Sequence, residues 1–205
     1  MKAPSRLATG SATALGVLLL ASCASSPERV EYHMDYKSYD SVAAMCEASS
    51  VVVLGSAGSS EVREINIAAQ PGDSEIENPS LGTGDPIPTE SFIIETVTTF
   101  EVTKVIVGNG VSEGDTIEVG QPGGAYKGTE YEAEMYSLNK SEEHMLFLQL
   151  YPGIPANLLN PMQSAVPVRE GVLVPLVSNT LAKELGGITA DSVCGDLAGM
   201  EARYP

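Results

Sequence analysis

The chain is poor in the residues that build many cores and most metal sites. None of its 205 residues is tryptophan and only 5% are aromatic, so valine, isoleucine and leucine must supply most of the core. Its two histidines, His33 and His144, lie far apart, which excludes a histidine-rich metal cluster. No twelve-residue calcium loop and no phosphate-binding glycine loop is found. We therefore expect no metal site and no cofactor.

Basic residues are also scarce. Eleven lysines and arginines stand against 27 aspartates and glutamates, a formal net charge of -16. Such a charge repels phosphate backbones and anionic lipid surfaces. Nucleic acid is thereby disfavoured as a partner, and the simplest role of the acidity is solubility.

The chain lacks an apolar run long enough to span a bilayer. Its N-terminal run, residues 12–20, is too short for a stable transmembrane helix. It follows Lys2 and Arg6, which is the layout of a secretory signal peptide over residues 1–22. That leader holds no carboxylates, so the mature chain carries about -18.

The leader ends in Leu20-Ala21-Ser22-Cys23, which resembles the lipobox of bacterial lipoproteins. The resemblance implies cleavage before Cys23 and acylation of that cysteine, and two or more acyl chains suffice for stable anchoring. We expect an extracytoplasmic protein that is anchored to a bacterial membrane through Cys23. An ordinary signal peptide followed by an incidental cysteine is the alternative.

The mature chain divides into a short tether and one domain. Residues 23–37 are polar and without clear periodicity, which predicts a flexible tether, and residues 38–205 form the domain. Within it, residues 70–90 are rich in proline, glycine and acidic side chains and read as a loop. Those carboxylates are either solvated or a weak calcium site.

Residues 92–119 predict a long strand, a tight turn and a second strand. Apolar side chains alternate from Ile94 to Val102, and their parity changes after Lys104, which indicates a bulge. Gly108, Gly110 and Gly114 supply the turn. A long bent strand paired with a shorter one predicts a small curved sheet or barrel.

The rest of the domain alternates between strand and short helix patterns. Residues 50–55 form a β-branched run typical of a strand buried on both faces. A glycine and serine break separates them from a further strand at residues 62–68. Residues 145–151 read as a central strand and residues 165–175 as a hairpin, with helix patterns at 39–48, 181–185 and 190–197. The predicted barrel core is Phe100, Val102, Ile117, Val119, Leu146 and Leu148.

Lipidation of Cys23 leaves two cysteines, Cys46 and Cys194. An even pair in an oxidising compartment favours a disulfide. Such a bridge would bring the first and last helical segments side by side. Two buried free thiols are the alternative.

The segments Phe100-Glu-Val102, residues 114–119, Pro122-Gly123-Gly124 and residues 144–148 are together similar to small secreted bacterial domains with a netrin-like, or tissue-inhibitor-of-metalloproteinases-like, OB barrel. The resemblance implies a mainly β fold. Its core would be a five-stranded Greek-key barrel with short N- and C-terminal helices packed against it. The strand patterns of the domain, with the last hairpin counted as one of them, would supply this barrel. The family's inhibitor mechanism needs a free N-terminal cysteine amine, which acylation of Cys23 would remove.

Two serine motifs match catalytic patterns by letter. Gly110-Val-Ser112-Glu-Gly114 resembles a nucleophile elbow but lies in the predicted turn, and Ser137-Leu-Asn-Lys140 lacks companion motifs. We therefore expect a non-enzymatic binding or envelope-assembly module whose partner is an extracytoplasmic protein or a small ligand. A protease-inhibitor-like domain, or a serine hydrolase that uses Ser112 or Ser137, is the alternative.

Overall fold

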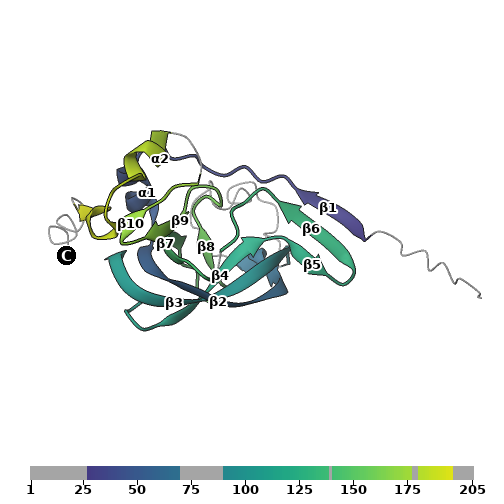
Figure 1. Ribbon diagram of the computed structural model, residues 1–205. Helices are drawn as coiled ribbons and strands as arrows, with labels where there is room; N and C mark the ends of the chain where they lie inside the picture. The colour runs from purple at the N-terminus through teal and green to yellow at the C-terminus, as the bar shows by residue number, and fades with distance from the viewer. Residues whose placement is uncertain (1–26, 70–89, 139, 177–179, 196–205) are drawn as a thin grey trace, which may run out of the picture.

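The computed structural model describes residues 27–69, 90–138, 140–176 and 180–195, and the fold is mainly β, as the sequence predicts (Figure 1). The long strands are β2 (Val51–Asn66), β3 (Phe92–Gly108), β4 (Thr116–Pro122) and β7 (Glu143–Gln149). The shorter strands are β1 (Glu28–Tyr32), β5 (Gly124–Tyr126), β6 (Thr129–Ala133), β8 (Ala156–Leu158), β9 (Ala165–Arg169) and β10 (Val172–Leu173). The helices are α1 (Val42–Ala48), α2 (Thr180–Leu185) and the 3-10 turns η1 (Ile67–Ala69) and η2 (Ala190–Ser192).

The strands form two sheets. The larger has seven strands in the order β10-β9-β7-β2-β3-β4-β8, and β8 also pairs with β7. This second pairing joins β7, β2, β3, β4 and β8 into a partial ring. The smaller sheet has the order β1-β6-β5. It lies at the opposite end of the molecule from the two helices (Figure 1).

The ladder between β2 and β3 bends at several irregularities. Two register shifts, between Val52 and Val53 and between Leu54 and Gly55, lie on either side of Lys104 on the partner strand. They confirm the bulge that the parity change predicts. A third shift lies between Ala57 and Ser60. The predicted glycine and serine break is wrong, because β2 continues through it with this irregularity instead of ending.

Gly55 permits a close approach of β2 and β3 in the ring. A Cβ atom at this position would collide with the backbone carbonyl of Glu101 and lie 2.6 Å from Cε1 of Phe100. The Phe100 ring, which is fully buried, therefore packs against the bare backbone of β2. Any larger residue at position 55 would force the strands apart or displace the ring.

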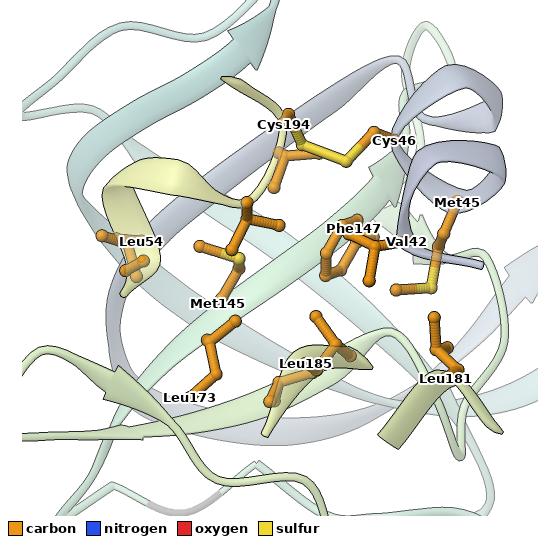
Figure 2. Close-up of a cluster of buried hydrophobic side chains, with 14 of the residues drawn as sticks. Val42, Met45, Cys46, Leu54, Met145, Phe147, Leu173, Leu181, Leu185 and Cys194 are labelled. Carbon is orange, nitrogen blue, oxygen red and sulfur yellow. A yellow bond between two sulfur atoms is a disulfide. The ribbon is translucent and has the colours of Figure 1, made fainter. Parts of the chain in front are cut away.

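The first part of β2, residues 51–55, is buried on both faces, as its β-branched run predicts. Val51 and Val53 point into the ring, while Val52 and Leu54 point away from it. The inner cluster collects side chains from all five strands of the ring. The outer cluster joins the other face of the sheet to α1, α2 and η2 (Figure 2). These two clusters thus lie on opposite faces of the sheet, and a third, smaller cluster contains Ile65, Ile93 and Val97.

The predicted barrel-core residues all belong to the inner cluster or touch it. Phe100, Val102, Val119, Leu146 and Leu148 are buried in it, and Ile117 is half-buried against it.

The composition of the ring differs from the prediction. Its fifth strand is β8, in a segment whose glycine and prolines predict a break, and not the last hairpin, β9 and β10. That hairpin extends the larger sheet outward from β7. A strand of three residues is too short to show a period, which is why the sequence does not reveal β8.

The smaller sheet is a second difference. Strand β1 lies inside the predicted flexible tether, residues 23–37, and pairs in parallel with β6. Strands β5 and β6 lie in a segment that reads as polar and irregular. The side chains of this sheet are exposed or half-buried, so no apolar alternation marks it in the sequence.

A disulfide joins Cys46 of α1 to Cys194, just after η2, which confirms the predicted pair (Figure 2). Helices α1 and α2 also contact one another. The backbone N–H of Val42, in the first turn of α1, donates a hydrogen bond of 2.8 Å to Oε2 of Glu184 in α2. The predicted helix at residues 190–197 begins with η2, and its residues 196 and 197 lie outside the described residues.

Removing the disulfide should destabilise the domain strongly. The two cysteines are 148 residues apart, and closing so long a loop contributes about 5 kcal/mol in the chain-entropy model. We expect Cys46→Ala/Cys194→Ala to lose about 2 to 5 kcal/mol of unfolding free energy in urea. Dithiothreitol should lower the stability of the native protein and leave that of the double variant unchanged. Equal stability of the oxidised and reduced native protein would contradict the role assigned to this bridge.

Candidate functional site

A cleft of about 500 Å³ opens on the outside of the ring. Gly120 and Asn157 border it, and they alternate along β4 and β8 with Val119 and Ala156 of the inner cluster, so they face outward. The walls are largely apolar or aromatic and include Met34, Tyr36, Tyr39, Ile67, Ile93 and Leu159. Clefts of this size and lining are typical of small-ligand sites. We call it the Glu95 cleft, after the acidic residue that lines it.

Glu95 projects from β3 into this cleft as a buried acid. Its side chain is only 5% exposed, and Oε2 has no hydrogen-bond partner among the described residues. Burial raises the pKa of Glu95 to about 6, although the positive charge of Arg63 lowers it in part. At neutral pH the cleft thus contains a largely ionised carboxylate with an incomplete set of partners.

Arg63 lies directly across from Glu95 in the ladder between β2 and β3, yet it does not neutralise it. Its Nη2 lies 2.6 Å from Oε2 of Glu118, and its Nε lies 3.4 Å from Oε1 of Glu61. Two exposed carboxylates therefore hold the guanidinium that would otherwise be the natural partner of Glu95.

Gly120 leaves room for the carboxyl group. A Cβ atom at this position would collide with Oε2 of Glu95 and would lie 3.4 Å from Cβ of Pro155. Because Gly120 has no side chain, the Glu95 carboxyl group can occupy this position beside β4.

One wall of the cleft is the segment between β1 and α1, residues 33–39, which we call the strap (Figure 1). Two amides from the loop before β9 hold it in place. Asn160 Nδ2 donates to the carbonyl of Lys37 at 3.1 Å. Gln163 accepts from the backbone N–H of Tyr39 at 3.0 Å and donates to its carbonyl at 3.1 Å. Both amide side chains are buried, so the strap has a defined position over the sheet.

Two large side chains of the strap, Met34 and Tyr36, are exposed to solvent. Met34 and Tyr36 are 36% and 37% exposed, which is high for large apolar residues. They border both the Glu95 cleft and a second, polar hollow of about 530 Å³ on the other side of the strap. Exposed apolar residues gathered at a cavity are typical of a binding surface.

His144 is a second buried titratable group, at a separate place. It is fully buried on β7, and neither ring nitrogen has a hydrogen-bond partner among the described residues. Burial lowers its pKa, against the opposing charge of Glu142. Its ring lies 6.1 Å from that of Tyr136, centroid to centroid, and its side chain shares the inner face of β7 with Leu146 and Leu148.

The structure does not bring the two candidate serines to a histidine within the described ranges. Ser112 lies exposed in the turn before β4, where its backbone N–H donates to Asp115. Ser137 is exposed in the loop before β7. The lipidation residue Cys23 and most of the acidic loop at residues 70–90 lie outside the described residues.

Sequence reasoning missed the Glu95 cleft. In the sequence Glu95 is one more polar residue in an alternating strand. The available signal is that apolar residues precede and follow it closely, at Ile93, Ile94 and Val97. The cleft also needs Arg63 to be engaged elsewhere and the strap to lie overhead, and neither follows from local sequence.

In the described part of the chain, no three histidine, cysteine, aspartate or glutamate side chains gather in a way that could hold a metal ion. No helix in those ranges has the length and apolar character needed to cross a membrane. Comparisons of the chain with protein-family models, curated proteins and solved structures found no match.

Glu95 should make stability depend on pH. Because its pKa rises from 4.5 to about 6 on folding, the folded protein retains a proton that the unfolded chain releases. The protonated Glu95 carboxyl therefore adds no cost to the free energy of unfolding below pH 4.5, and this stability is lost as pH rises through 6 and the buried group ionises. We expect Glu95→Gln to be about 2 kcal/mol more stable than the native protein at pH 7.5 and nearly equal to it at pH 4.

Urea unfolding between pH 4 and pH 8 measures this difference. The control is Glu101→Gln, an exposed acid on the same strand, which should follow the native pH profile. A native protein that is as stable at pH 7.5 as Glu95→Gln would show that the Glu95 carboxylate is compensated.

Proposed function

We propose that this chain is a non-catalytic binding module on a lipid-anchored, extracytoplasmic bacterial lipoprotein, and that the Glu95 cleft is its ligand site. The observation that carries the proposal is a buried, incompletely paired carboxyl group on the wall of a largely apolar cleft of about 500 Å³. Groups whose burial opposes stability concentrate at functional sites. The lipobox before Cys23 and the disulfide between Cys46 and Cys194 support an extracytoplasmic location.

We also propose that the ring is an OB-type barrel. Around the ring the strands lie in the order β2, β3, β4, β8 and β7. Numbered by their order in the chain, these are the first, second, third, fifth and fourth strands. The last two strands thus exchange places, as in a Greek-key barrel. This order supports the resemblance found in the sequence. The barrel serves as a scaffold, and the ligand site lies on its outer surface under the strap.

The anchor would hold this domain close to the membrane. Strand β1 begins at Glu28, so only residues 24–27 separate it from Cys23. A chain of that length spans about 14 Å at full extension. The mature protein would therefore have a much shorter tether than residues 23–37 suggest.

Small ligands should bind the native protein in the cleft. A fragment library screened by saturation-transfer NMR should give hits that Ala48→Phe abolishes, because Ala48 borders the cleft at the end of α1. The matched control is Ala43→Phe, the same change at an exposed position of the same helix, and it should retain the hits. Hits that survive Ala48→Phe would place binding elsewhere, and a screen without hits would refute the small-ligand site.

The anchor is tested separately in bacterial cells. We expect the mature native protein to fractionate with membranes and its N-terminal peptide to carry acyl groups on Cys23 in mass spectrometry. Cys23→Ser should release the domain into the soluble extracytoplasmic fraction, since its thiol is the acyl acceptor. An unmodified N-terminal peptide, or release of the native protein, would contradict the lipoprotein assignment.

A further inference from the structure

The Glu95 cleft has a negative charge on its buried wall and a positive charge at its exposed edge. Glu95 is 95% buried there, since its exposure is 5%. Among the described lining residues the cation is Lys37, which is exposed on the strap with Nζ held 5.2 Å above the centre of the Tyr39 ring. The charge that lowers the pKa of Glu95 is that of Arg63 and not that of Lys37.

Arg63 pairs with exposed carboxylates and not with Glu95. Its Nη2 donates a hydrogen bond of 2.6 Å to Glu118, and its Nε lies 3.4 Å from Glu61 without making a hydrogen bond. Among the described residues Glu95 has no ion pair. A buried carboxylate in this condition is costly unless a cation or hydrogen-bond donor reaches it. The cleft gives such a group access to Glu95.

The walls suit the body of an organic cation. Aromatic faces attract cationic groups through the ring quadrupole, and Tyr36 and Tyr39 both border the cleft. Burial and the charge of Glu95 raise the pKa of Tyr36, and burial raises that of Tyr39, so both phenols are neutral at physiological pH. Ile67, Ile93 and Leu159 supply apolar surface around them.

We propose that the Glu95 cleft binds small organic amines, with the protonated ammonium group paired to the Glu95 carboxylate and an apolar or aromatic body between the strap and the sheet. This deepens the proposed function and rests on it, since it requires the cleft to be a ligand site. A neutral ligand would leave the carboxylate without a charge partner. An anionic ligand would be repelled by Glu95 and by the net charge of the chain.

Three probes of nearly equal size separate these classes: 2-phenylethylamine, 2-phenylethanol and 3-phenylpropionate. Their affinities for the purified domain are measured at pH 7.5 by NMR titration. We expect the amine to bind at least about ten-fold more tightly than the alcohol, and the propionate to bind most weakly. Glu95→Gln should abolish the preference for the amine, while Glu101→Gln on the same strand retains it.

The preference should also weaken on acidification. Between pH 7.5 and pH 5 the Glu95 carboxylate takes up a proton and loses the charge that attracts the ammonium. The other charged groups around it are Arg63, Glu61, Glu118 and Lys37. We expect the ratio of amine to alcohol affinity to fall at least three-fold between these pH values in the native protein and to stay constant in Glu95→Gln.

Failure of the amine proposal can be distinguished from failure of the proposal that the cleft is a ligand site. Alcohol binding as tight as amine binding, an amine preference that persists in Glu95→Gln, or no binding by any probe would overturn the amine proposal. Hits that Ala48→Phe abolishes would then keep the cleft as a ligand site of another chemistry. If Glu95→Gln does not fold, Glu95→Met serves as the second variant without a carboxylate, with the same expected loss of preference.

Discussion

The pairing of β2 with β3 is the interaction on which the rest of the structure depends. These strands have 16 and 17 residues and are the longest in the described part of the chain. Their irregular ladder bends, so one stretch of the pair contributes to the ring while another extends past it. The ring encloses the inner cluster, and the extension carries Arg63 opposite Glu95. Scaffold and candidate site are thus built on a single pair of strands.

Burial of the first part of β2 on both faces shows how a chain without tryptophan builds its core. Its alternating valines and Leu54 serve two clusters at once, one inside the ring and one beneath the helices. The outer cluster also unites the two ends of the domain, because α1 comes early and α2 and η2 come late in the chain. The disulfide between Cys46 and Cys194 ties these elements covalently where their hydrophobic contacts already meet.

At Glu95 the preference of a charged side chain for water conflicts with the buried position that the fold gives it. An acid in a buried strand position opposes stability, and the neighbouring arginine bonds to exposed glutamates instead. Such inconsistencies are expected where a site serves binding at the expense of stability. Gly120 and the amide-anchored strap preserve this arrangement, since one leaves space for the carboxyl group and the other forms a wall above it.

The sequence by itself determined the features that rest on local periodicity or on counting. Alternation of apolar residues predicts the mainly β class, the bulge and turn within residues 92–119, and the core residues around Phe100. The β-branched run predicts that the first part of β2 is buried on both faces, and cysteine arithmetic predicts the disulfide pair. Only the tertiary structure decided that β8 closes the ring, that β1 pairs with β6 and that Oε2 of Glu95 has no hydrogen-bond partner among the described residues. In each case short or polar segments that are far apart in the chain contact one another. Such segments have no repeating pattern of apolar residues from which the contact could be predicted.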